Sequence, residues 1–266
     1  MPFFPLTKVN SVEGFCTLHN FPPNDWQKSN DKEKFIWAIY PENNKWKTKK
    51  ISKINHGESL TINYRDLNIS IEKSNPLILL QLRETNLPKI LNILPKHEFT
   101  YTDSPVWRAT IGFNLGNTQT SYQGEINPFP QKASLLTFHP FIQYEKTKNY
   151  FIFMNLESSP LNRKAFIEIY RSQSKEFVDK IEIENNCTNE IPLDIYDFNS
   201  KELPVFICRD MAGIPFGFGI NISDKMISLE HTHPPASFAL HGDRFLVQKR
   251  IKSEWLETLN RLKSYD

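Results

Sequence analysis

Short runs of alternating apolar and polar residues follow one another along most of the chain from about residue 35 onward. In residues 166–170, Phe-Ile-Glu-Ile-Tyr, neighbouring side chains would point to opposite faces of a strand, with one face buried and the other solvated. Turn residues separate these runs, as is typical of an antiparallel sandwich or barrel. The predicted strands are KFIWAIY, ESLTINY, PLILLQLRE, VWRATIGFN, ASLLTFHPFI, NYFIFMNLE, AFIEIYRS, FVDKIEIE, EIPLDIYDF, LPVFICRD, PFGFGINI and MISLEH.

Only the C-terminal segment has the period of an amphipathic helix. Asp243 is a suitable N-cap, and charged residues separate an apolar stripe. The stripe consists of Phe245, Val247, Ile251, Trp255, Leu259 and Leu262. Two interpretations stay open: the helix docks on its own sandwich, or it forms a contact between subunits of a homo-oligomer.

The length of 266 residues exceeds the usual size of one domain. Residues 54–86 and 184–213 also share an order of elements, in which a strand, an acidic turn and a proline-led apolar strand end in Arg plus an acid. A repeat this far apart indicates duplicated domains rather than a solenoid. We therefore expect a mainly β protein with two tandem antiparallel β-sandwiches, immunoglobulin-like or jelly-roll-like, over residues 1–118 and 119–241. The C-terminal amphipathic helix would occupy residues 242–266.

The second half carries a family resemblance. The order MNLESSP, AFIEIYRS, DKIEIENN, IPLDIYDF, ELPVFICRD resembles the small sandwich of bacterial sensory-rhodopsin transducer proteins, and EKSNPLILLQLRET in the first half is similar to the strand that closes its sheet. The resemblance implies a jelly-roll-like sandwich that binds a sugar-like ligand or a protein partner without catalysis. It carries over no functional residues, because no motif fixes their positions.

Charge and composition narrow the class of protein. The 32 basic and 30 acidic residues are mixed along the chain, which argues against a nucleic-acid binder with a basic face. The run KWKTKK, residues 45–50, is interpreted as a solvated hairpin tip without a function. No secretory signal and no run of eighteen apolar residues is present, so we expect no membrane insertion. Three cysteines without CxxC spacing favour reduced structural thiols and a cytoplasmic location.

Three histidines stand in the stretch SLEHTHPPASFALHGDR, residues 228–244. His231 and His233 would point to the same side of a strand, Pro234 and Pro235 would end it, and the following loop could return His241 to them. Three imidazoles with an open fourth position suit zinc or another divalent metal. A metal-free polar pocket at a sandwich end and three unrelated histidines are the alternatives. No cofactor is therefore assigned.

Residues 104–130 gather aromatic, amide and charged side chains between glycines. Trp107 and Tyr122 could hold a sugar ring, Gln123 and Glu125 could bind its hydroxyls, and Arg108 could bind an acidic group. The alternative is a glycine-rich crossover that satisfies its own backbone. His139 and His233 are expected to line the same cleft at the junction of the two sandwiches.

Motifs for common catalysts are missing from the sequence. It contains no G-x-S-x-G elbow, Walker loop, G-x-G-x-x-G or HExxH. The sequence therefore predicts a non-catalytic binding protein that recognises a carbohydrate-like small molecule or a protein partner at the junction. One alternative is a His-ligated metalloenzyme acting on a small polar or sugar-derived substrate, with Glu230 or Glu125 as general base. The other is a structural subunit that assembles through the terminal helix.

Overall fold

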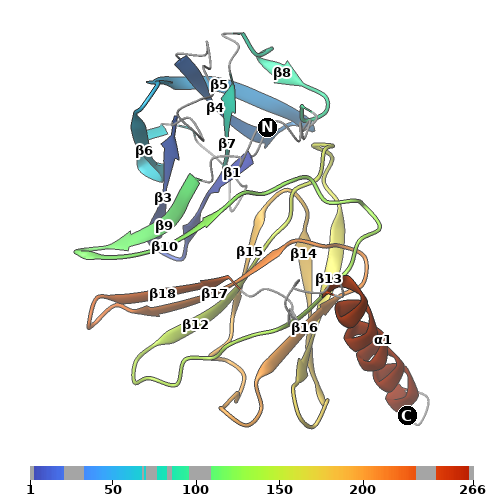
Figure 1. Cartoon of the computed structure of the whole chain (residues 1–266). Helices are drawn as coiled ribbons and strands as arrows, with labels where there is room; N and C mark the ends of the chain where they lie inside the picture. Colours follow the sequence, from blue (N-terminus) through green and yellow to red (C-terminus); the bar gives the residue numbers. More distant parts are fainter. Residues whose placement is uncertain are drawn as a thin grey trace.

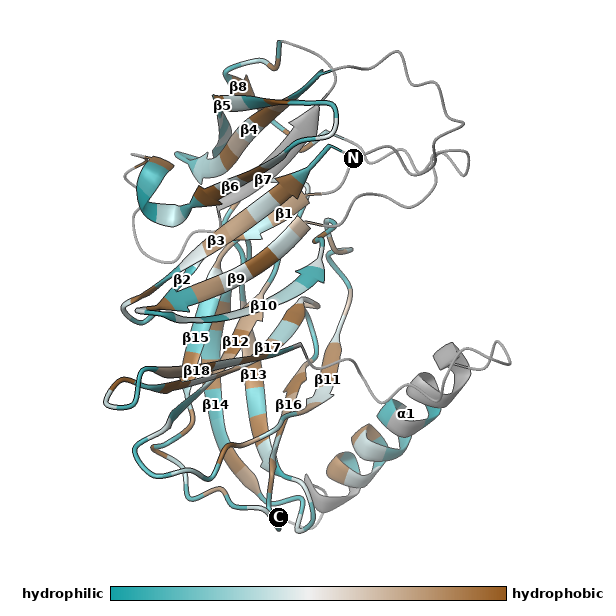
Figure 2. Cartoon of the chain, turned by 60° about the vertical axis from the view of Figure 1, so that its left-hand side comes forward, coloured by the Kyte–Doolittle hydropathy of each residue, from teal (hydrophilic) through white to brown (hydrophobic). Residues whose placement is uncertain are grey.

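The computed structural model describes residues 3–20, 33–67, 69, 77–82, 86–95, 109–231 and 244–263. Within these ranges the protein is mainly β, with several antiparallel sheets and one C-terminal helix (Figure 1). Figure 2 shows hydrophobic and hydrophilic positions alternating along strands such as β9 and β13. The expectation of a mainly β protein that ends in a helix is confirmed.

The first half of the chain forms two five-stranded sheets. One has the order β1-β7-β4-β5-β8, and the other has the order β10-β9-β3-β2 with β6 also paired to β3. The elements are β1 (Phe3–Leu6), β2 (Lys8–Val9), β3 (Val12–His19), β4 (Glu33–Glu42), β5 (Lys45–Asn55), β6 (Ser59–Asn63), the 3-10 helix η1 (Tyr64–Leu67), β7 (Leu77–Leu82), β8 (Ile90–Leu91), β9 (Ala109–Leu115) and β10 (Thr118–Gly124).

The second half forms two four-stranded sheets and the helix. The sheets have the orders β11-β16-β13-β14 and β15-β12-β17-β18. The elements are β11 (Leu135–Phe138), β12 (Lys148–Met154), β13 (Lys164–Arg171), β14 (Phe177–Glu184), β15 (Thr188–Pro192), β16 (Pro204–Cys208), β17 (Ile214–Asn221), β18 (Met226–His231) and α1 (Arg244–Lys263). The expected boundary between residues 118 and 119 falls at the hairpin that joins β9 to β10.

Each half has its own apolar core. In the first half, Phe4, Leu18 and Ile36 belong to a cluster that draws on both of its sheets. In the second half, Phe151 and Phe206 belong to another such cluster, with their rings stacked at 3.7 Å between centroids. Burial of apolar surface is the main favourable term in folding, so these clusters stabilise the sheet pairs.

A third core joins the two halves. On β12, Phe151 and Phe153 point into the core of the second half, whereas Ile152 and Met154 point into a cluster shared with the first half. In that shared cluster the ring centroid of Phe113 lies 4.9 Å from that of Phe218. The central strands β12 and β17 of sheet β15-β12-β17-β18 are therefore buried on both faces. Apolar side chains fill the junction at which the sequence predicted a ligand cleft.

Helix α1 covers the outer face of sheet β11-β16-β13-β14 (Figure 1). Trp255 and Leu259 are buried there against Tyr170, Val205 and Ile207. At least this part of the predicted apolar stripe is used within the chain, as one of the two interpretations requires. The homo-oligomer stays a prediction. Among the described residues, no helix combines the length and apolarity needed to cross a bilayer.

Every strand predicted from alternation overlaps a strand of the structure, although β15 covers only the start of its predicted run. The missed strands include β5, which contains the lysine run interpreted as a hairpin tip. The turn lies earlier, at Asn43 and Asn44, whose φ angles are 50° and 57°. Asparagine tolerates this left-handed conformation better than most residues. The lysines consequently lie on a strand, where every second side chain shares a face.

Candidate functional site

The predicted metal ligands fall mostly outside the described residues. His233 and His241 lie there, and His231 is described only as the last residue of β18, paired with Phe216 of β17. Within the described ranges, no group of three histidine, cysteine or acidic side chains is placed to hold a metal ion. The zinc site and the metalloenzyme that depends on it stay predictions.

The predicted sugar contacts are only partly described. Trp107 and Arg108 lie outside the described residues. Tyr122 and Gln123 are consecutive on β10, so their side chains point to opposite faces and do not act together on one ligand. Tyr122 packs into the shared core, 5.0 Å from the Phe216 ring centroid, and burial raises the pKa of its hydroxyl.

Glu125 lies just after β10. The side-chain nitrogen of Asn127 donates to its Oε1 over 3.4 Å. Oε2 of Glu125 and Oδ1 of Asn127 are shielded from solvent and have no hydrogen-bond partner among the residues that the structure describes. Each of these two oxygens could accept a hydrogen bond from a ligand hydroxyl or coordinate a cation. They therefore do not indicate which kind of ligand would bind beside Glu125.

His139 lies in the core of the second half. Its ring is 2% exposed and meets the rings of Phe151 and Phe206 edge-on, at centroid distances of 5.0 and 5.4 Å. Burial lowers its pKa from 6.5 to about 3, because charging the ring among these phenyl groups would cost hydration. Sequence reasoning placed His139 on a cleft wall, but this packing gives it the role of a neutral core residue.

This burial predicts a pH dependence of stability. The folded pKa lies below the unfolded value of 6.5, so unfolding takes up a proton at any pH between about 6.5 and 3. The free energy of unfolding should therefore fall as the pH drops through that window. In His139→Phe, the number of protons taken up on unfolding should be smaller by about one, so the slope against pH should be shallower. Urea unfolding at a series of pH values measures this slope. An unchanged slope in His139→Phe would contradict the burial of a neutral ring.

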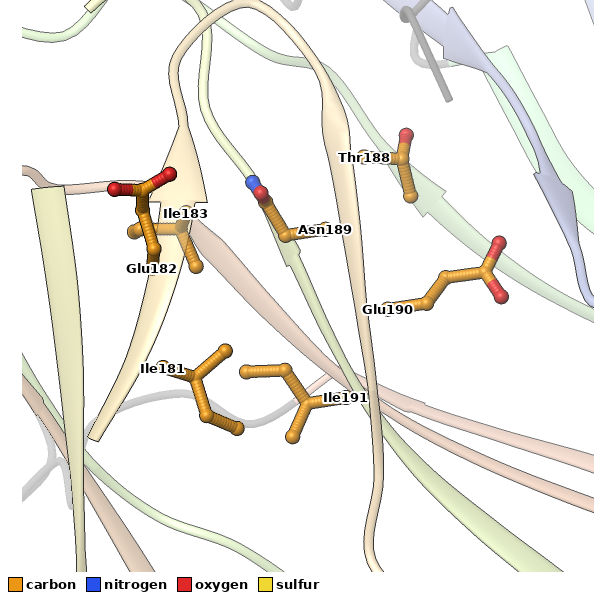
Figure 3. A pocket seen from close by; sticks show the side chains of 7 residues that line it. All are labelled: Ile181, Glu182, Ile183, Thr188, Asn189, Glu190 and Ile191. Carbon is orange, nitrogen blue, oxygen red and sulfur yellow. The ribbon is translucent and has the colours of Figure 1, made fainter. Parts of the chain in front are cut away.

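The structure has a pocket between the edge strands β14 and β15, with a volume of about 370 Å³ (Figure 3). Ile181 and Ile191 point toward each other across it, whereas Glu182 and Glu190 point away. Glu182 pairs with Lys164, and Glu190 accepts a hydrogen bond from the Asn10 backbone. The pocket thus lies at the side of the second-half core where β14 and β15, the edge strands of its two sheets, diverge. Its polar groups already have partners.

A second pocket, of about 650 Å³, has a different character. Four lysines line it together with aromatic, apolar and neutral polar side chains. We call it the basic pocket; its lining residues are Trp37, Tyr40, Lys47, Thr48, Lys49, Lys50, Asn86, Leu87, Lys89 and Ile90. Volumes of 300–1,000 Å³ are typical of small-molecule sites.

Strand register explains how the basic pocket forms. Lys47 of β5 lies opposite Tyr40 of β4, and Lys50 lies opposite Trp37. Because Trp37 and Tyr40 pack into different cores, these two pairs lie on opposite faces of the sheet. Strand β8 pairs with β5 only at Trp46 and Lys47. The basic pocket therefore wraps around the edge of β5 where β8 leaves it.

The basic pocket is lined by cations and by no carboxylate. Lys47 lies 3.5 Å from Glu42, which is outside the lining. Lys49 donates to the Leu67 carbonyl over 2.9 Å, and the ammonium of Lys50 sits 4.0 Å from the centroid of the Phe35 ring. Contacts with neighbouring residues thus fix the positions of Lys47, Lys49 and Lys50. Among the described residues, only Lys47 of the lining lysines is paired with an acid.

One donor of the lining lacks an acceptor. The indole Nε1 of Trp37 is buried and has no hydrogen-bond partner in the described part of the chain. Leaving such a donor unpaired costs about 1–3 kcal/mol. The lysine cations of the lining suit the binding of an anionic molecule. The lining side chains include no carboxylate, thiol or imidazole.

Sequence reasoning missed the basic pocket. The run KWKTKK was the available signal, but its lysines are balanced by acids elsewhere in the chain. Asn86, Leu87 and Lys89 reach the basic pocket only through the fold, from the segment that leads into β8. No protein-family model, curated protein or solved structure matches this chain, so the case for its function stands on this geometry alone.

Proposed function

We infer that this protein is a non-catalytic binding protein whose ligand is a small acidic carbohydrate-like molecule held in the basic pocket. The observation that carries this inference is a pocket lined by four lysines and no carboxylate. Lysine ammonium groups bind carboxylate and phosphate oxygens through charge-assisted hydrogen bonds, which are stronger than neutral ones. The absence of a carboxylate, thiol or imidazole from the lining favours binding over catalysis.

The rest of the lining favours a sugar over a bare anion. Tyr40 is partly exposed and supplies an aromatic ring, on which the C–H face of a sugar ring can pack. Thr48 and Asn86 supply neutral polar groups for hydroxyls, although the Thr48 hydroxyl already donates to the Pro88 carbonyl over 2.7 Å. A volume of about 650 Å³ has room for a sugar with its acidic substituent.

The fold supports a rigid binding scaffold. We interpret each half as one β-sandwich, because each has a pair of sheets and a core that draws on both. The apolar junction would hold the two sandwiches together rather than bind ligand. The site therefore moves from the junction, where the sequence predicted it, to the sheet edge. Location in the cytoplasm stays a prediction.

Ligand binding should raise the melting temperature by mass action. Uronic acids and hexose phosphates are expected to stabilise the protein, whereas the uncharged parent hexoses should not, because the lysines would bind only the acid. Differential scanning fluorimetry across this panel measures the shift, and calorimetry then gives the Kd. Equal shifts for acidic and uncharged sugars would contradict a charge-based pocket.

The double substitution Lys47→Gln/Lys89→Gln should weaken the Kd for the best acidic sugar at least tenfold. It removes two cations from the basic pocket, and hydrogen bonds to charged groups contribute about 1.5–3 kcal/mol each. The matched control Lys132→Gln/Lys201→Gln changes the net charge equally at exposed positions outside the pocket. If both double variants lose the same affinity, the effect is one of overall charge and the proposed site is wrong.

A further inference from the structure

Two exposed isoleucines stand beside the basic pocket. Ile90 is 50% exposed and lines it, and Ile93 is 62% exposed on the segment that follows β8. Leu94 is buried in the shared core, and its backbone N–H donates to the Ser158 carbonyl over 2.9 Å. Leu94 therefore anchors the segment and leaves its neighbour Ile93 on the outside.

Cations surround these isoleucines. The ammonium of Lys45 donates to Oδ1 of Asn92 over 2.8 Å, which places a lysine next to Ile93. Lys89 directly precedes Ile90 and also lines the basic pocket. Lys47 lies on β5 across from Ile90 in the β5–β8 pair. The two strands lie side by side at one end of the molecule (Figures 1 and 2).

We propose that this edge surface, made of Lys45, Lys47, Lys49, Lys50, Lys89, Ile90 and Ile93, docks on an anionic lipid surface. The proposal rests on the proposed function, because the pocket lysines would hold the acidic headgroup. Ile90 and Ile93 would enter the boundary between headgroups and acyl chains. The protein would lie on the bilayer without spanning it, as basic and apolar surfaces together do in peripheral proteins.

Charge complementarity selects this occupant. A second copy of the chain would bring like charges together, because the edge surface has five lysines, of which only Lys47 pairs with an acid, Glu42, among the described residues. A soluble polyanion would satisfy the lysines but leave both isoleucines in water. An anionic bilayer meets both needs, since it presents acidic headgroups above an apolar layer. Each lysine near such a surface strengthens binding by about fivefold.

The test is co-sedimentation of the whole protein with vesicles. Vesicles of phosphatidylcholine and phosphatidylglycerol in equal parts should pellet the protein, whereas vesicles of phosphatidylcholine alone should not. Ile90→Ser/Ile93→Ser should weaken vesicle binding roughly tenfold, because two apolar side chains lose their burial. The matched control Ile195→Ser/Ile222→Ser, at positions 70% and 57% exposed elsewhere, should bind vesicles like the unaltered protein.

The soluble acidic sugar separates this proposal from the proposed function. Ile93→Ser changes the isoleucine that lies outside the pocket lining, so it should weaken vesicle binding yet keep the Kd for that sugar. Sugar binding without vesicle binding would overturn the lipid surface and leave the proposed function standing. If the protein binds neither the acidic sugar nor the vesicles, both the proposed function and the docking proposal are rejected. Vesicle binding that ignores phosphatidylglycerol or the isoleucines, or a dimer that Ile90→Ser/Ile93→Ser dissolves, would also overturn the docking proposal.

Discussion

Replacement of Trp46 by alanine is expected to lower the free energy of unfolding by about 3–5 kcal/mol, the usual cost of truncating a buried tryptophan or phenylalanine. Trp46 is 0% exposed and lies in the core shared by the two halves. Its indole N–H also donates to the Ser158 carbonyl over 2.9 Å, which links β5 to the second half. Truncation would leave a cavity at the junction and remove one of the two hydrogen bonds to the Ser158 carbonyl, which also accepts from the Leu94 N–H.

Urea unfolding of Trp46→Ala and Trp46→Phe measures this effect. Trp46→Phe keeps most of the apolar volume and loses only the hydrogen bond, so it should cost clearly less, about 1–2 kcal/mol. The comparison separates packing from hydrogen bonding at the same position. A loss below about 1 kcal/mol in Trp46→Ala would contradict a well-packed junction. It would also reopen the junction as a place for a ligand.

Replacement of Arg163 by methionine should lower the free energy of unfolding by about 3 kcal/mol, because it leaves the Glu157 carboxylate buried without its cation. The Glu157 side chain is 3% exposed. Arg163 donates to Glu157 Oε1 from Nε over 3.0 Å and also from Nη2, and its Nη1 donates to the Asp210 carbonyl over 2.8 Å. One guanidinium thus holds together two loops of the second half.

The double variant Glu157→Met/Arg163→Met is the informative control. With both charges removed, no buried charge is left unpaired, and replacement of a buried pair by apolar residues is often close to neutral. The double variant should therefore be more stable than Arg163→Met alone. Equal free energies of unfolding for the single and double variants in urea would show that the unpaired Glu157 carboxylate does not destabilise the folded protein.

Local pattern determined much of the strand content. Alternation placed β13 because every second residue of a half-buried strand must be apolar, and this need is visible within a few residues. It failed at β10, where Thr118–Gly124 is polar on most positions and was interpreted as a crossover. It failed at β5 because only Trp46 and Ile54 are buried there among lysines.

The candidate site was much less accessible from the sequence. The histidine stretch and Trp107 attracted attention through residue type, but residue type does not tell which side chains share a cavity. His139 illustrates this, since burial between two phenyl rings makes it a neutral core residue. The basic pocket depends on residues 86–90 lying against β5, which is a pairing between distant segments.

The sequence by itself determined a mainly β chain with a C-terminal amphipathic helix and three unlinked thiols, all of which the structure contains. Periodicity and residue type are local properties, so they can be read without the fold. Only the tertiary structure decided that the junction is filled and that lysines converge at a sheet edge. Strand order and register are long-range properties, and they alone bring Trp37, Lys50 and Lys89 around one pocket.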